Sequence, residues 1–340
     1  LWQSGDGTDI LGTTAHPITY TYAMWDGTSW STPQIAIGGL SQTLEMDVAV
    51  YSATQAALVY VVDADGELAT GADTELYYSH YDGSQWAVPQ PLTNDTITDT
   101  TPALIYDAAG GLKLLWLRGT DLVMLDSSLN IADVQHVRAD STASGFQDLR
   151  LSRSPAGHLA LAWQEMYADG ADVAYSVYDA SSGRWGMDQP FMHDAALETA
   201  FAPAFTDDGT FYLAYRKSVT EYVTDTVEIS PSLSITVTNM PQLGRSDLYM
   251  LHHTVGRDLT ISDLTVTPAY PAAGETVTLT AQVHNVGDLE TGPIDVRFDD
   301  GENAIITVTV APTLTAGTWV TATTTWSAPV PLTSPHTLRA

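Results

Sequence analysis

The sequence predicts an all-β protein in which small antiparallel sheets repeat along the chain. Short runs of aromatic and β-branched residues are separated by Asp-Gly and Gly-rich turns, and helix signals are scarce. These runs recur at intervals of roughly 40 to 60 residues, a spacing that indicates stacked supersecondary units. With 44% hydrophobic residues, the chain is expected to fold and not to remain disordered.

The clearest repeat lies between Glu75 and Trp116. Asp82-Gly83 is a turn signal, because Gly accepts a positive φ and Asp hydrogen-bonds to nearby backbone. Four strands are expected, at residues 76–81, from Trp86, at 103–106 and at 112–117. We expect these strands to form one up-and-down sheet. It must stack on copies of itself, because a sheet this small cannot bury both faces alone.

Imperfect copies precede and follow this stretch, and their aromatic residues recur at equivalent places. One set follows the first turn: Trp30, Trp86 and Trp185. Another set ends an inner strand: Trp116, Trp163 and Tyr215. Such recurrence predicts a structural role in which the large rings fill the seams between sheets. A fifth passage is expected to add strands at 226–229, 233–237 and 247–252.

About five four-stranded repeats over residues 1–256 are typical of a β-propeller, complete or incomplete. The composition changes after Gly256, where apolar and polar residues begin to alternate. This alternation is clear at 277–283, 294–298, 306–310 and 320–326. Period-2 alternation indicates strands with one buried face, so residues 257–340 are predicted to be an immunoglobulin-like β-sandwich.

The pattern Y-x-x-Y-D-G-x-x-W-x-x-P, followed by an apolar strand ending in Trp, resembles the repeats of sialidase-like propellers. The resemblance covers roughly residues 1 to 255 and implies a propeller from a large secreted bacterial protein. In the Asp-box of true sialidases, a residue separates Asp from Gly. Here Asp26-Gly27 and Asp82-Gly83 are adjacent, so the resemblance is to the wider superfamily and not to the enzyme.

Residues 257–340 resemble the CARDB family, whose members are immunoglobulin-like modules of bacterial and archaeal surface proteins. The resemblance rests on Asp258-Leu259, Pro268, Pro271, Gly274-Glu275, Asn285-x-Gly287, Ala316-Gly317 and Trp326. The family usually continues past His336-Thr337-Leu338 into a further strand. We expect that strand either to be truncated in this chain or to come from elsewhere, such as a neighbouring molecule.

The amino-acid composition narrows the classes of expected binding partner. The formal net charge of −29 repels nucleic acid and anionic membranes, so neither is an expected partner. The sequence has no run of about 18 apolar residues, so no membrane span is predicted. There is no cysteine, which excludes disulfides and thiol chemistry.

Trp25, Tyr81 and Tyr178 are the candidate ligand-binding residues. Each directly precedes the Asp that opens a turn, where an exposed ring could stack on a sugar. No catalytic residue is assigned. A sialidase-like site would need three converging arginines, and no motif orders Arg118, Arg150, Arg153 and Arg216.

Asp63, Asp65 and Glu67 are candidate calcium ligands, because they place oxygen atoms at alternate positions around Gly66. Ordinary turn chemistry explains the same residues, and the later ligands of an EF-hand are missing. No other cofactor is expected. His252-His253 is not expected to bind metal, because neighbouring side chains of a strand point to opposite faces.

Together these features predict a non-enzymatic extracellular or cell-surface protein with a structural or adhesive role. The propeller would present an interaction face, and the sandwich would act as a spacer or assembly module. The expected partners are other surface proteins, glycans or further copies of the chain. Three alternatives stay open: a carbohydrate-binding, lectin-like propeller, a sialidase-like glycoside hydrolase, and a subunit of an extracellular filament or layer.

Overall fold

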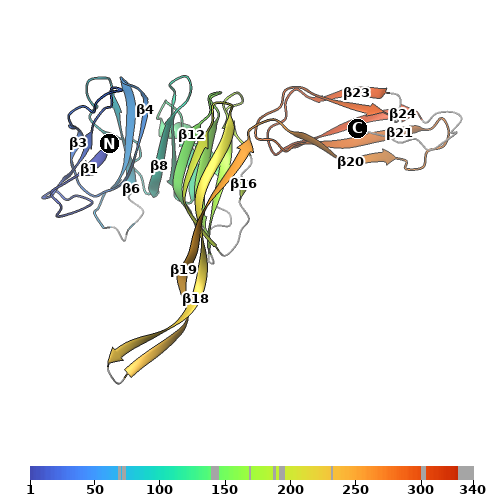
Figure 1. Ribbon diagram of the computed structural model, residues 1–340. Coiled ribbons are helices and arrows are strands. Elements are labelled where there is room, and N and C mark those ends of the chain that lie inside the picture. Colours follow the sequence, from blue (N-terminus) through green and yellow to red (C-terminus); the bar gives the residue numbers. More distant parts are fainter. Residues whose placement is uncertain are drawn as a thin grey trace.

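A computed structural model describes residues 1–67, 70, 74–138, 145–167, 170–186, 189–190, 196–230, 233–299 and 304–327. Apart from the short 3-10 turn η1 (Ile131–Asp133), the regular elements in these ranges are β-strands, which confirms the predicted all-β class. No helix within them is long and apolar enough to cross a membrane. A row of small sheets leads to a separate sandwich (Figure 1).

Five antiparallel sheets follow one another through the N-terminal part. The first contains β1 (Trp2–Ser4), β2 (Ile18–Tyr22) and β3 (Gln34–Leu40). The second contains β4 (Thr43–Ser52), β5 (Gln55–Asp63), β6 (Thr74–Tyr81) and β7 (Gln90–Pro91). The third contains β8 (Asp99–Tyr106), β9 (Leu112–Arg118), β10 (Asp121–Leu125) and β11 (Gln135–Arg138).

The fourth and fifth sheets are linked by a single parallel pairing between Ala171 and Leu197. The fourth contains β12 (Phe146–Arg153), β13 (Leu159–Met166) and β14 (Ala171–Asp179), with β15 (Arg184–Trp185) and β16 (Gln189–Pro190) on β14. The fifth contains β17 (Ala196–Phe205), β18 (Thr210–Ser230) and β19 (Leu233–Thr254).

The first strands of the second, third, fourth and fifth sheets lie next to one another; these are β4, β8, β12 and β17. β8 contacts β4 and β12, and β12 contacts β17. Up-and-down sheets arranged in sequence around neighbouring inner strands are the architecture of a β-propeller, which confirms the predicted fold.

The expectation that residues 75–116 form one sheet is wrong. β6 and β7 belong to the second sheet, whereas β8 and β9 belong to the third. The four strands of the sequence repeat are therefore the last two strands of one sheet and the first two strands of the next. The polar loop after β7 is not a connection within a sheet: it carries the chain from the outer strand of one sheet to the inner strand of the next.

The predicted fifth set of separate strands is also wrong. β18 and β19 are continuous strands of 21 and 22 residues that pair along their length as one hairpin. The hairpin extends far beyond the other sheets (Figure 1). Residues 226–229 and 233–237 therefore continue the strands of the fifth sheet.

Hydrophobic clusters fill the seams between sheets. Trp116 lies between the second and third sheets and Trp163 between the third and fourth, and both are fully buried. Each indole Nε1 donates to a buried carboxylate, with Trp116 bound to Asp99 at 2.7 Å and Trp163 bound to Glu165 at 2.9 Å. Tyr215 occupies the same place in the next seam. The predicted structural role of these three rings is confirmed.

A β-bulge recurs opposite each of these rings. The register of β8 against β9 slips between Thr100 and Ala103, so that Thr101 and Pro102 together oppose Trp116. The bulges in β12 and β17 likewise lie opposite Trp163 and Tyr215. The first bulge residue has a left-handed backbone in all three strands, with φ of 53° at Thr101, 54° at Asp148 and 51° at Ala200. This conformation is costly for residues other than glycine.

The sandwich pairs two sheets around one core. β20 (Leu259–Thr267), β21 (Thr276–Asn285) and β24 (Trp319–Ser327) form one sheet, and β22 (Ile294–Asp299) and β23 (Ala304–Ala311) form the other. The alternating residues Val277, Leu279, Ala281 and Val283 are buried between them, as predicted. The question of a final strand concerns residues 328–340, which lie outside the described residues.

The loop after β21 docks the sandwich onto the propeller. Asp288 Oδ2 lies 2.6 Å from His253 Nε2 of β19, and Asp179 Oδ2 of β14 accepts the backbone N–H of Glu290 at 3.1 Å. Leu289 packs against the hydrophobic cluster between the fourth and fifth sheets. The two domains are therefore joined by packing and hydrogen bonds as well as by the chain.

The Asp-Gly turns form as expected. Asp82 Oδ1 accepts from the backbone N–H groups of Ser84 and Gln85 at 2.8 and 2.9 Å. The amide of Gln85, followed by the hydroxyl and amide of Ser84, lowers the pKa of Asp82 from 3.8 to about 2. Asp26 accepts from Thr28 and Ser29 in the same way.

Removal of a seam indole should be severely destabilising. We expect Trp163→Ala to lower the free energy of unfolding by about 3 to 5 kcal/mol, because it opens a cavity and leaves Glu165 without its indole donor. Urea denaturation measures the change. The control Trp319→Ala removes an exposed ring, and equal losses for the two variants would contradict the seam role.

Glycine at a bulge should relieve backbone strain. We expect Ala200→Gly to raise the free energy of unfolding by about 1 kcal/mol, because glycine accepts the left-handed φ without penalty. Ala202→Gly is the matched control in ordinary strand backbone and should lower stability by about 0.5 to 1 kcal/mol. If both variants lose stability equally in urea denaturation, Ala200 is not strained.

The turn at Asp82 should contribute to stability only while its carboxyl group is ionised. Because the pKa in the folded state lies below 3.8, the contribution is complete above about pH 4 and is lost as the pH falls towards 2. We therefore expect Asp82→Ala to lower the melting temperature at pH 6 and to match the parent near pH 2. Asp82→Asn keeps an acceptor and serves as the control; a loss in Asp82→Ala that does not change with pH would refute this account.

Candidate functional site

Three equivalent aromatic pairs close the turns that follow β2, β6 and β14. Trp25 pairs with Trp30, Tyr81 with Trp86, and Tyr178 with Trp185, at ring-centroid distances of 5.6, 5.6 and 5.3 Å. In each pair the first ring precedes the turn and the second follows it. The candidate ligand-binding residues Trp25, Tyr81 and Tyr178 thus share one structural role.

Their exposure differs from what the sequence predicted. Tyr81 and Tyr178 are only 8% exposed, so the expectation of open ring faces is wrong for both. Trp86 and Trp185 are half-buried, whereas Trp25 is 53% and Trp30 67% exposed, so Trp30 does not fill a seam. The difference follows from position, because the pairs in the second and fourth sheets pack on the preceding sheet. Sugar binding by Trp25 stays a prediction.

The candidate calcium ligands lie in a tight turn after β5. Asp63 Oδ1 accepts the backbone N–H of Gly66 at 2.8 Å, and Asp65 Oδ1 accepts that of Glu67 at 2.7 Å. Asp63 is buried, whereas Asp65 and Glu67 are exposed. In the part of the chain that the structure describes, no group of three His, Asp or Glu residues could hold a metal ion. Calcium binding at this turn stays a prediction.

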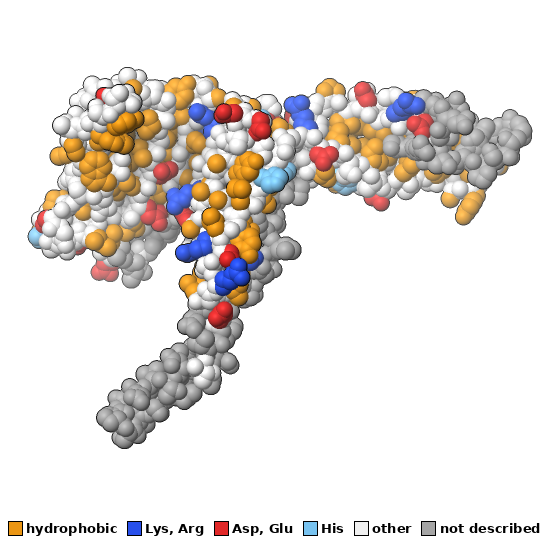
Figure 2. Space-filling view, in the orientation of Figure 1, with side chains coloured by type: hydrophobic (Ala, Val, Ile, Leu, Met, Phe, Trp, Pro, Cys, Tyr) orange, Lys and Arg blue, Asp and Glu red, His pale blue; other side chains and the backbone are white. Residues whose placement is uncertain are grey.

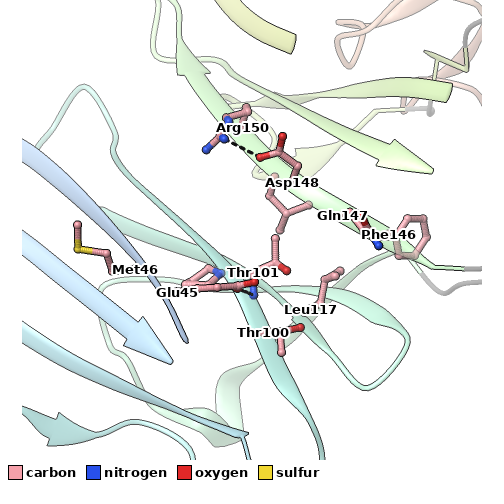
Figure 3. A pocket seen from close by; sticks show the side chains of 11 residues that line it. Glu45, Met46, Thr100, Thr101, Leu117, Phe146, Gln147, Asp148 and Arg150 are labelled. Carbon is pink, nitrogen blue, oxygen red and sulfur yellow. Dashed lines mark hydrogen bonds and ion pairs between the residues drawn. The ribbon is translucent and has the colours of Figure 1, made fainter. Parts of the chain in front are cut away.

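A cavity of about 620 Å³ opens where the inner strands of three sheets meet. It is lined by residues of β4, β8, β9 and β12: Glu45, Met46, Thr100, Thr101, Pro102, Leu117, Phe146, Gln147, Asp148, Leu149 and Arg150. Figure 3 shows how side chains from opposite walls surround this space. We call it the axial pocket, because it lies at the inner strands of the propeller.

The bulges shape the axial pocket. Thr101 and Asp148, the left-handed residues of β8 and β12, both line it. Glu45 of β4 accepts the backbone N–H of Thr101 at 2.5 Å and so ties two neighbouring sheets together (Figure 3). Strained backbone that its surroundings hold in place is a frequent feature of binding sites, because it preorganises the lining.

Arg150 is the cationic residue in the lining. Its guanidinium lies 2.6 Å from Asp148 Oδ1, and both side chains remain partly exposed to solvent (Figure 3). Asp47, beside the pocket on β4, accepts the backbone N–H of Leu104 at 2.6 Å. Burial raises the pKa of Asp47, although the amides of Leu104 and Val48 and the charge of Arg150 act in the opposite direction.

This lining can bind a polar, ring-shaped ligand. Threonine hydroxyls, the amide of Gln147 and two carboxylates offer donors and acceptors, while Met46, Leu117 and Phe146 supply apolar contact. The partly exposed Arg150 guanidinium can form paired hydrogen bonds with a carboxylate or sulfate group. The volume lies within the usual range of small-molecule sites, roughly 300 to 1,000 Å³.

The other arginines lie elsewhere. Arg118 is bound by Asp99 of the third sheet and by Asp95 of the loop that precedes it. Arg153 donates to the carbonyl oxygens of Tyr106 and Asp107, and Arg216 donates to Thr199. The four arginines named from the sequence therefore do not converge, and they do not form the cluster that a sialidase-like site needs.

The sequence singled out Arg150 but not the rest of the pocket. The bulges that place Thr101 and Asp148 have no local composition signal. A spacing signal exists, since the members of three pairs are each 16 positions apart: Thr100 and Trp116, Gln147 and Trp163, Thr199 and Tyr215. A constant distance between the start of an inner strand and its seam ring could have located the bulges.

Comparison with solved structures finds carbohydrate-active enzymes at low similarity. An ulvan lyase of polysaccharide lyase family PL25 is 11% identical, with 80% of this chain and 90% of the lyase covered and a TM-score of 0.42. The intramolecular trans-sialidase from Ruminococcus gnavus is 11% identical, with coverages of 78% and 83% and a TM-score of 0.38. An endo-arabinase from Bacteroides thetaiotaomicron is 13% identical, with coverages of 67% and 88% and a TM-score of 0.37.

At these scores the likeness establishes no shared activity or site. No curated protein sequence matches this chain. The CARDB family matches residues 256–340, which contain β20 to β24 of the sandwich. The sandwich is therefore a CARDB domain, as its resemblance predicted, and in this chain it follows a β-propeller.

Proposed function

We propose that this chain is a carbohydrate-binding, adhesive part of an extracellular protein, with the axial pocket as its glycan site. The pocket itself carries this proposal: a preorganised hollow at the inner strands that combines polar groups, apolar patches and an accessible arginine. The CARDB domain would act as the spacer that holds the propeller at a set distance from its attachment.

The charged residues of the lining narrow the chemical class of the expected ligand. Arg150 can pair with an anionic sugar substituent, and the nearby carboxylates Glu45 and Asp148 can accept hydrogen bonds from sugar hydroxyls. Phe146 and Met46 offer apolar contact for the C–H face of a ring. We therefore expect acidic saccharides, such as those with uronate, sialate or sulfate groups, to bind in preference to neutral ones.

The docking of the two domains fits an adhesive role. Asp288 and the backbone of Glu290 contact different sheets of the propeller, so the pocket keeps a defined orientation relative to the CARDB domain. A binding module on a spacer benefits from such preorganisation, because less orientational freedom is lost when the ligand binds.

A glycan array followed by calorimetry tests the proposal. The parent should bind acidic saccharides, and Arg150→Ala should weaken binding by about tenfold or more through loss of a charge-assisted contact. Arg150→Lys should recover only part of the affinity, because lysine cannot make paired hydrogen bonds.

Trp25→Ala is the comparison variant, because Trp25 is the other candidate sugar-binding residue and lies on the first sheet, outside the pocket lining. It should bind like the parent. Loss of binding in Trp25→Ala together with unchanged binding in Arg150→Ala would move the site to the turn of the first sheet. Failure of the parent to bind any saccharide would refute the proposed function.

A further inference from the structure

The first sheet of the propeller has an exposed apolar face. One row of paired residues crosses this sheet and consists of Trp2 of β1, Thr21 of β2 and Ile35 of β3. Trp25 and Trp30 pair across the turn that follows β2, and the alternation of side chains along a strand places Trp25 on the same side as Thr21. The four large side chains are all exposed, and we call this surface the head face. Exposed apolar patches of this kind commonly mark interaction sites.

Equivalent faces elsewhere in the propeller show what covers such a surface. Trp86 occupies the place of Trp30 in the second sheet, and its ring lies 6.2 Å from that of Tyr22 in the preceding sheet. Trp185 of the fourth sheet packs against a cluster that contains Leu115 and Met124 of the third. In both cases the face that carries the post-turn indole is covered by a sheet of the same kind.

The fifth sheet has a complementary exposed face, which we call the tail face. Three rows cross it in register: Ala204–Tyr212–His252, Ala202–Ala214–Met250 and Thr199–Arg216–Leu248. Met250 is 66% and Leu248 78% exposed, and Ala202 and Ala204 are exposed as well. Figure 2 shows hydrophobic atoms, with basic side chains beside them, over the region of β18 and β19.

The junction of the fourth and fifth sheets is an internal example of the same combination. There Ala160, Ala162 and Val173 of the fourth sheet pack against the rings of Phe211 and Tyr215 of the fifth. The fourth sheet also contributes the ring of Tyr175, whose centroid lies 4.9 Å from that of Phe211. A face of mostly small residues thus receives a face of aromatic residues. The tail face presents Ala202, Ala204 and Ala214, and the head face presents tryptophans.

Charge at the margins favours the same contact. Arg216 is exposed on the tail face, where its guanidinium donates to Thr199 Oγ1. Asp26 lies in the turn between Trp25 and Trp30, at the edge of the head face. The backbone amides of Ser29 and Thr28 hold the pKa of Asp26 well below its ordinary value, so its carboxylate is negative.

We propose that the head face of one copy packs on the tail face of a second copy, so that the chain associates head to tail. The contact would repeat between copies the packing that already joins successive sheets within one chain. Because the two faces differ, the association is heterologous and leaves a free head and a free tail on every dimer. It can therefore continue into longer assemblies or close into a ring.

Sedimentation velocity at physiological salt over a wide concentration range tests this proposal. We expect the parent to form dimers and larger species as its concentration rises. Trp30→Glu on the head face and Met250→Glu on the tail face should each weaken association by about tenfold or more, as hot-spot changes do. Tyr270→Glu alters an exposed residue of the CARDB domain and is the control that should behave like the parent.

Mixing the two variants gives the sharper result. A Trp30→Glu chain keeps its tail face and a Met250→Glu chain keeps its head face. An equimolar mixture should therefore form a dimer and nothing larger, although each variant alone remains monomeric. A parent that stays monomeric at every concentration, or association unaffected by either substitution, would overturn the proposal. So would a mixture that fails to dimerise.

Discussion

Burial of sheet faces in the seams is the constraint on which the propeller depends. A four-stranded sheet has two faces and no helix to cover either of them, so each face requires another sheet. Trp116 and Trp163 meet this requirement with large rings, and each indole N–H meets a buried carboxylate at the same time. The seams therefore satisfy apolar burial and polar pairing together.

The same rings lead to the axial pocket. Each seam ring lies opposite a bulge, and each bulge holds a residue with a left-handed backbone. Two of these residues, Thr101 and Asp148, line the cavity next to Arg150. Packing at the seam and the shape of the pocket thus depend on one repeated irregularity.

The all-β class, the propeller and the CARDB domain were predictable, because strand alternation, turn residues and repeat spacing are local signals. The assignment of strands to sheets was not predictable from the sequence. The pattern of residues 75–116 is the same whether its polar loop connects two strands of one sheet or connects one sheet to the next. The length of the β18–β19 hairpin was missed for a similar reason. In the sequence, the polar residues that interrupt the apolar pattern of β18 and β19 resemble turns, although each strand is continuous.

The candidate site was harder to foresee than the fold. Trp25, Tyr81 and Tyr178 share one sequence context, yet only Trp25 is exposed, because exposure depends on whether another sheet covers the turn. Arg150 was visible as an arginine among several, but its role depends on the bulge that places Asp148 beside it. Such residues are defined by contacts between sheets, which no short motif records.

The double attachment of the CARDB domain has a mechanical consequence. Asp288 engages β19 and the backbone of Glu290 engages β14, so tension on this domain enters the propeller through two sheets at once. The load is then shared between the fourth and fifth sheets. Force applied to the CARDB domain therefore reaches the propeller without relying on a single peptide linker.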